Sequence, residues 1–225
     1  MTPARCGNCV NWRQQHFSSA IGALVSAGWK KLAVMLIGAL ALAVTRAAGQ
    51  SPSIDVALLA RANTGDAVAE VQVGEQYAQA AAAEHHKALI AEDLKQAAAW
   101  FRKAAGQNSI AGELHLAALY RDGGEGFPRD MAQAAAWYRK AADEGDAGAQ
   151  GTLGVLYSLG QGVPQSDVEA YFWLDLAAAV KGPNQEKYAA NRQMVGEHIT
   201  ADELSDVEDR VEKWKAVHPR PDATE

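Results

Sequence analysis

The stretch AAAWFRKAA at residues 97–105 recurs at residues 134–142 as AAAWYRKAA, with a single aromatic exchange. A third tryptophan continues the series, because Trp100, Trp137 and Trp173 lie 37 and 36 residues apart. An active site is normally built once, whereas self-similarity at a fixed period of about 20–50 residues is typical of repeat architectures. The repeated stretch therefore predicts a stack of structural units and not a duplicated catalytic centre.

Each unit is predicted to fold as two helices. Apolar residues recur at i, i+4, i+7 and i+8 along residues 149–157, which is the period of a helix. Gly160 and Gly162 are expected to end that helix, because glycine adopts positive φ angles at little cost. Asp130 and Ser166 each precede a tryptophan of the second helix by seven residues, where an N-cap oxygen is expected.

The recurring small and aromatic residues are predicted to form the core of the stack. Gly74, Ala117 and Gly154 occupy one repeat position, where a small residue would let a neighbouring helix approach closely. The predicted repeat core is Gly74, Tyr77, Trp100, Leu116, Tyr120, Trp137, Leu153, Gly154, Tyr157 and Trp173. Because one helix pair cannot cover its own apolar face, we expect the pairs to stack as an all-α, right-handed α-solenoid of antiparallel helix pairs.

The quoted residues also carry a family resemblance. The pattern L/V-G-x-x-Y, then G-x-G-V/F-P, then D and A-x-x-W-Y-x-K-A-A-x-x-G-D-x-x-A, resembles the Sel1-like repeat, a relative of the tetratricopeptide repeat. The resemblance covers about residues 55–180, and two full units match at nearly every signature position. The first unit lacks the Gly-x-Gly turn and has about six extra residues, so its first helix is expected to continue through the alanines.

The two ends of the repeat array are predicted to differ from its middle, because solenoids need atypical ends to stay soluble. Thr200 to Glu203 form a capping box, and Leu204, Val207, Val211 and Trp214 follow on one face of a C-terminal helix. Asp175-Leu176 replaces the Arg-Lys of the earlier units, as expected where a capping element covers the last one. The predicted organisation is a leader at 1–49, a partial N-terminal repeat or cap at 50–66, the solenoid at 67–181, C-terminal capping helices at 182–218 and a disordered tail at 219–225.

The leader has the features of a secretory signal. Lys30 and Lys31 precede an apolar run of 13 residues from Leu32 to Val44, and small residues follow up to Gly49. Cleavage after Gly49 and a periplasmic or secreted location are expected. Two alternatives stay open: an uncleaved inner-membrane anchor, which would also give membrane association, and a mitochondrial transit peptide.

Composition and motifs argue against several classes of function. Residues 50–225 contain 16 Lys and Arg residues against 27 Asp and Glu residues, a formal charge of −11 that disfavours nucleic acid as a partner. Both cysteines, Cys6 and Cys9, lie in the leader. The sequence has no G-x-S-x-G, S-x-x-K, H-E-x-x-H or phosphate-loop motif, and His85-His86 is interpreted as exposed surface. No cofactor, metal or catalytic residue is predicted.

The resemblance implies a non-enzymatic adaptor or scaffold of the cell envelope or secreted space, which holds a protein or peptide partner in the solenoid groove. Exposed positions of the first helices are predicted to line that groove: Glu113, His115, Arg121, Gln150, Thr152 and Ser158. The alternative is an envelope enzyme or enzyme regulator acting on peptidoglycan or β-lactams.

Overall fold

The computed structural model describes residues 52, 54–84 and 86–218. The predicted leader with its cleavage site at Gly49, the cysteine pair, His85 and the tail at 219–225 lie outside these residues. In the described part the regular structure is helical, apart from one isolated bridge between Gly124 and Phe127. The helices are α3 (Val56–Asn63), α4 (Ala67–Ala83), α5 (Lys87–Ala105), α6 (Ile110–Asp122), α7 (Met131–Asp143), α8 (Ala147–Leu159), α9 (Asp167–Ala178), α10 (Gln185–Gly196) and α11 (Ala201–Val217).

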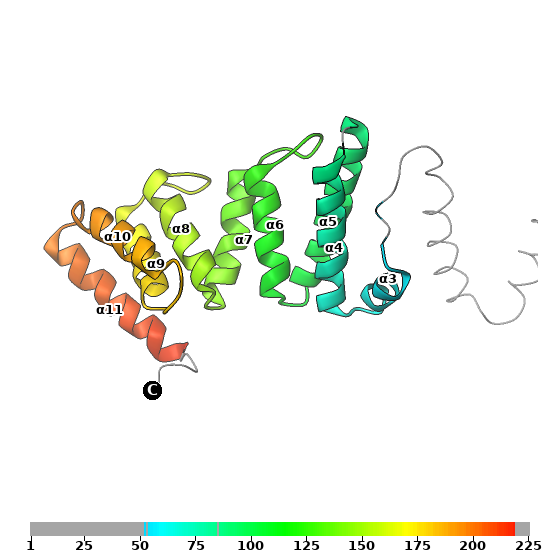
Figure 1. Ribbon diagram of the computed structural model, residues 1–225. Helices are drawn as coiled ribbons and strands as arrows, with labels where there is room; N and C mark the ends of the chain where they lie inside the picture. Colours follow the sequence, from blue (N-terminus) through cyan, green and yellow to red (C-terminus); the bar gives the residue numbers. More distant parts are fainter. Residues whose placement is uncertain (1–51, 53, 85, 219–225) are drawn as a thin grey trace, which may run out of the picture. The chain divides into compact units, whose positions relative to one another are not determined.

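The helices pack in sequence order (Figure 1). The pairs α4–α5, α6–α7 and α8–α9 form three hairpins, and α5 with α6 and α7 with α8 join each hairpin to the next. Both α10 and α11 pack against α9, and α10 also reaches α8. Contacts between sequence neighbours are what a repeat stack requires, and the all-α helical repeat prediction is confirmed. No described helix combines the length and the apolar character that a membrane span needs.

The ends of the helices follow the predicted signals. Asp130 accepts a hydrogen bond from the backbone N–H of Gln133, and Ser166 accepts one from that of Glu169, so both predicted N-caps are confirmed. These bonds satisfy backbone donors that would otherwise have no partner in the first turn. Gly160 ends α8 with a φ of 64°, in the left-handed region that favours glycine.

Close approach of the two helices of a hairpin explains the small residues. A Cβ atom on Gly74 would lie 2.5 Å from the ring of Phe101, and one on Gly154 would lie 2.6 Å from Leu174 Cγ. Phe101 and Leu174 occupy the same repeat position, one residue after the tryptophan. The predicted role of Gly74 and Gly154 is therefore confirmed. The side chain that fills the space beside each glycine belongs to the residue directly after the tryptophan.

The predicted core residues lie in or against the hydrophobic core, but to different depths. The buried ones are Gly74, Tyr77, Trp100, Leu116, Leu153, Gly154 and Trp173. Tyr120, Trp137 and Tyr157 are half-buried and pack against the buried clusters. In the middle hairpin the deepest aromatic side chain is Tyr138, next to Trp137.

Repeats are also joined by hydrogen bonds between equivalent residues. Arg102 of α5 donates to the hydroxyl of Tyr120 in α6, at 2.9 Å between Nη2 and Oη. The equivalent Arg139 of α7 donates to the hydroxyl of Tyr157 in α8. Each of these bonds connects the second helix of one hairpin to the first helix of the next.

The last hairpin replaces this link with contacts to the C-terminal helices. Asp175 stands where the earlier units have arginine, and its carboxylate pairs with Arg192 of α10 and, at 3.5 Å, with Lys215 of α11. Leu176, in place of lysine, is fully buried. The capping element therefore covers α9 as the substitutions predicted.

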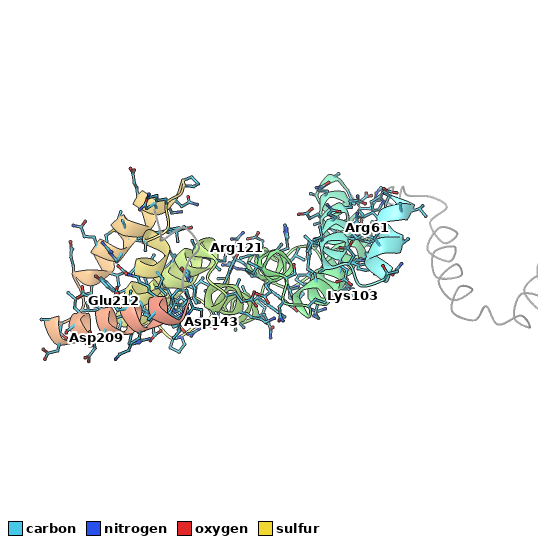
Figure 2. All side chains as sticks on the ribbon, turned by 90° about the horizontal axis from the view of Figure 1, so that it is seen from below. Arg61, Lys103, Arg121, Asp143, Asp209 and Glu212 are labelled. Atoms are coloured by element: carbon cyan, nitrogen blue, oxygen red, sulfur yellow. The ribbon has the colours of Figure 1, made fainter. Side chains whose placement is uncertain are left out.

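The N-terminal box of α11 is also as predicted. The N–H of Glu203 donates to Thr200 Oγ1, and the N–H of Thr200 donates to Glu203 Oε2, at 3.3 and 2.9 Å. Val207 and Val211 lie on the inner face of α11. Both are buried there and join the core of the second and third hairpins. The outer face of α11 is exposed and carries Asp209 and Glu212 (Figure 2).

Candidate functional site

Two of the six residues predicted to line the groove are not on the surface. Glu113 and Gln150 are both 0% exposed, so their prediction as exposed groove residues was wrong. They occupy equivalent positions, three residues before Leu116 and Leu153, which places them on the apolar face of their helices. The prediction rested on helical periodicity, and it assigned the wrong face to these two positions.

Each of these buried polar side chains lies at the C-terminal end of the second helix of the preceding hairpin. For Glu113 that helix is α5, and for Gln150 it is α7. Gln150 Nε2 donates to the carbonyl of Ala142, at 3.1 Å. At the preceding junction Lys140 Nζ donates to the equivalent carbonyl, that of Ala105, at 3.1 Å and lies 2.6 Å from Glu113 Oε1. The last carbonyls of a helix lack partners within the helix, so these side chains complete the junctions between hairpins.

The other four predicted residues are partly exposed, and three of them line hollows on the first helices. His115 lines a hollow between α4 and α6, whereas Arg121 and Thr152 line one between α6 and α8. Ser158 lines neither of these hollows, and its hydroxyl donates to the Val155 carbonyl of its own helix at 2.9 Å. Three of the six predicted residues thus line hollows, and the prediction that they bind a partner stays a prediction.

Three hollows follow one another along the first helices, and neighbouring hollows share residues. The α3–α4 hollow shares Glu75 and Gln79 with the α4–α6 hollow, which shares Asp122 with the α6–α8 hollow. Their volumes are about 510, 390 and 480 Å³ in that order. We call this series the first-helix groove.

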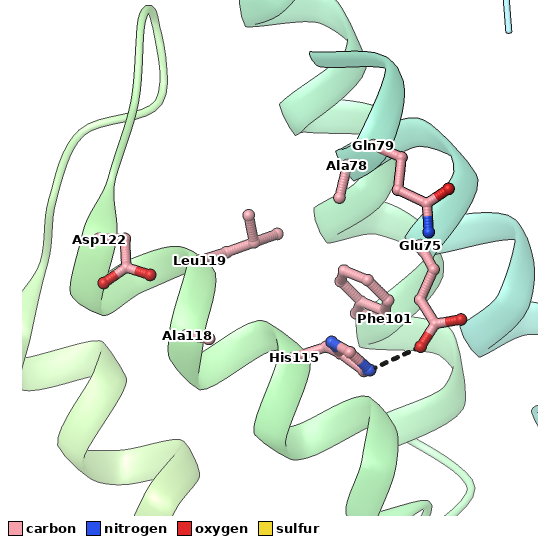
Figure 3. A pocket seen from close by; sticks show the side chains of 8 residues that line it. All are labelled: Glu75, Ala78, Gln79, Phe101, His115, Ala118, Leu119 and Asp122. Carbon is pink, nitrogen blue, oxygen red and sulfur yellow. Dashed lines mark ion pairs between the residues drawn. The ribbon is translucent and has the colours of Figure 1, made fainter. Parts of the chain in front are cut away.

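The α4–α6 hollow combines an apolar floor with polar groups (Figure 3). His115 Nε2 lies 2.9 Å from Glu75 Oε1, which ties α6 to α4. The imidazole stacks on the ring of Phe101 from α5, with 4.8 Å between centroids and 12° between planes. The hollow is lined by Glu75, Ala78, Gln79, Phe101, His115, Ala118, Leu119 and Asp122.

The charge of Asp122 is stabilised by its neighbour in the chain. Arg121 Nε and Nη2 donate to the two carboxylate oxygens of Asp122, at 2.7 and 2.9 Å. These hydrogen bonds lower the pKa of Asp122 and raise that of Arg121, so the carboxylate stays ionised at neutral pH. Arg121 also donates to the Tyr138 hydroxyl at 3.0 Å, which fixes its position beside the groove.

Sequence reasoning missed Glu75, Gln79, Phe101 and Asp122. Glu75 and Gln79 belong to the first repeat, whereas all six predicted groove residues lie in the second and third repeats. Asp122 lies seven residues after His115, two helical turns along the same face. Helical spacing from His115 could have identified Asp122, and the equivalent face of α4 holds Glu75 and Gln79. Phe101 lies on α5, so this signal does not find it.

A further hollow lies outside the first-helix groove. It is lined mainly by α10, with Tyr171 from α9 and Leu204 from α11, and its volume is about 600 Å³. Burial raises the pKa of the Tyr171 phenol. Across the described residues, no group of three or more His, Cys, Asp or Glu side chains could hold a metal ion.

Comparisons with known proteins agree with the repeat architecture. The Sel1 repeat family model matches residues 76–109, 110–146 and 148–179. The crystal structure of a protective antigen present in uropathogenic Escherichia coli strains, displaying an SLR fold, is 31% identical with a TM-score of 0.58. That match covers 71% of this chain and 32% of the antigen, so the chain spans about a third of the antigen's length.

A second solved structure, a Sel1 repeat protein from Oxalobacter formigenes, is 29% identical with a TM-score of 0.48. The match covers 58% of this chain and 92% of that protein. A comparison with curated proteins found no match.

The hairpin stack and its groove define a helical repeat protein, a class built around extended binding surfaces. Within that class the chain is a Sel1-repeat protein with three matched copies of the repeat. Sel1-repeat proteins typically mediate protein–protein interactions, and their fold is generally a non-catalytic interaction scaffold.

Proposed function

We propose that this protein is a non-enzymatic adaptor that holds a segment of a partner protein in the first-helix groove. The observation that carries the proposal is the series of three hollows, joined through Glu75, Gln79 and Asp122. A segment lying across several helices can contact each hollow in turn, as ligands of repeat proteins do on such surfaces. The typical role of Sel1 repeats in protein–protein interaction supports this proposal.

The groove is built on supported side chains. Glu75 and His115 are tied to each other, His115 rests on the buried Phe101, and Arg121 is tied to Asp122 and Tyr138. Side chains that are already ordered lose little conformational entropy when a partner binds. The arrangement therefore favours recognition of a partner over adaptation to many shapes.

We further propose that the adaptor acts in the bacterial envelope or outside the cell. The support is the basic, apolar and small-residue pattern of the leader, which ends at Gly49. Expression of the full chain in a bacterium, followed by fractionation and N-terminal sequencing, is expected to give a periplasmic or secreted protein that begins at Gln50. Retention of the leader in the inner membrane would instead support an anchored scaffold, and a cytoplasmic protein would contradict export.

Blocking the groove tests the binding function. The full chain is used to select binders from a random peptide library displayed on phage, and their affinities are then measured with Ala118→Trp. Ala118 lies in the α4–α6 hollow, and the equivalent positions hold Glu75 and Val155, so a larger side chain is compatible with the helix. We expect the selected peptides to bind Ala118→Trp at least about tenfold more weakly, because the indole fills the hollow.

The matched control is Ala136→Trp, the same change at an exposed alanine of α7 outside the hollows. This control is expected to bind the peptides with unchanged affinity. A library that yields no binder, or binders that tolerate Ala118→Trp as well as the control, would contradict the groove as the binding site.

A further inference from the structure

We propose that the partner segment inserts a basic side chain, preferentially arginine, into the α4–α6 hollow. This inference rests on the proposed function and specifies the chemistry of the partner. The hollow carries two carboxylates, those of Glu75 and Asp122, and the described residues that line it include no lysine or arginine.

Glu75 offers the acceptor for such a group, because both carboxylate oxygens of Asp122 already accept hydrogen bonds from Arg121. His115 engages Glu75 through Oε1, and Oε2 has no hydrogen-bond or ion-pair partner among the described residues. The Glu75 side chain is 40% exposed, so a ligand can reach it. A charge-assisted hydrogen bond from a guanidinium to a carboxylate is among the stronger polar contacts, and the planar guanidinium can engage both oxygens.

The floor of the hollow suits the aliphatic part of the same side chain. Ala78, Ala118 and Leu119 supply apolar surface beside the Phe101 ring. A lysine or arginine side chain covers apolar surface with its methylene groups while its charged end stays near polar groups.

The neighbouring hollows do not repeat this chemistry. The α6–α8 hollow contains Arg129, which has no ion-pair partner in the described part of the chain, and Arg121, which pairs with Asp122. The α3–α4 hollow contains Arg61, which pairs with Asp66. In this series only the α4–α6 hollow has no lysine or arginine in its lining, and its Glu75 is paired with a histidine instead.

The equivalent repeat positions show how this difference arises. Glu75 corresponds to Ala118 in α6 and Val155 in α8, and Asp122 corresponds to Leu159 in α8. Among the first helices α4, α6 and α8, only α4 therefore has a carboxylate at the Glu75 position, and only α6 has one at the Asp122 position. A basic residue of the partner would select the α4–α6 hollow and so fix where along the groove the segment lies.

The test uses peptides selected from a random phage-displayed library on the full chain. We expect the binders to be enriched in arginine, and to a smaller degree in lysine, relative to the unselected library. Glu75→Gln is expected to weaken their binding by about tenfold, since a charged hydrogen bond is lost while the side-chain shape is kept. Glu75→Lys, selected afresh against the same library, is expected to lose these binders and to enrich acidic ones.

The matched control is Glu125→Gln, because the Glu125 side chain is 46% exposed and lies outside the hollow. It is expected to leave the affinity within about twofold of the original. Binders that are neutral or acidic but are still excluded by Ala118→Trp would overturn this inference and leave the proposed function standing. Failure to obtain groove-dependent binders would overturn both.

Discussion

Replacing Phe101 with alanine is expected to lower the free energy of unfolding by about 3–5 kcal/mol, the usual loss when a buried phenylalanine is truncated. Phe101 is 1% exposed, and its ring contacts the two neighbouring helices α4 and α6. It fills the space left by Gly74 of α4, belongs to α5 and stacks on His115 of α6. Urea unfolding followed by circular dichroism measures the change.

The control for Phe101→Ala is Trp137→Ala, which removes a larger side chain at a half-buried position. We expect the smaller loss for Trp137, because the indole is already in contact with water in the folded protein. An equal or larger loss for Trp137→Ala would mean that the tryptophan position, and not the position after it, carries the packing between hairpins.

The second large effect is expected from Lys140→Leu, with a loss of about 3 kcal/mol. Glu113 is fully buried, and Lys140 is its ion-pair partner in the described residues. Removing one member of such a pair leaves a buried charge without compensation, which typically costs about 3–5 kcal/mol. The lower end applies because the Lys140 side chain is 41% exposed. The free energy of unfolding in urea again measures it.

The next hairpin provides the compensating change. There Gln150 takes the place of Glu113, and Leu176 takes the place of Lys140. Gln150 donates directly to the carbonyl of Ala142 at the end of α7. Lys140→Leu combined with Glu113→Gln reproduces this arrangement, so we expect the double variant to recover most of the lost stability. If the double variant is as unstable as Lys140→Leu, the buried charge is not the cause of the loss.

Sequence was sufficient for the fold because the signals for each hairpin are local. The N-cap residues Asp130 and Ser166, the helix end at Gly160 and the capping box from Thr200 act on their own helices. The small residues Gly74 and Gly154 then mark where two helices approach. What periodicity left undecided was depth, since Trp137 and Tyr138 are adjacent and only packing decides which is more deeply buried.

The groove was predicted less well because it depends on contacts between repeats. Periodicity placed Glu113 and Gln150 on the exposed face, although both residues bind groups at the helix junctions. The pairing of Glu75 with His115 joins the least regular repeat to a regular one, and such a pair has no local sequence signature. Residues that differ between repeats determine this surface, so the repeat pattern could not identify them.

The third unit has Asp175 where the first two have arginine, and this difference affects how the repeat array can change in length. Repeat arrays grow and shrink when whole units are duplicated or deleted. A unit inserted between the second and third hairpins would meet the Arg139 side chain on one side and offer an equivalent arginine on the other. A unit added after the third would separate Asp175 from Arg192 and Lys215 and would leave those two cations without their shared partner. The array can therefore be extended from its interior, whereas its C-terminal end accepts no new neighbour.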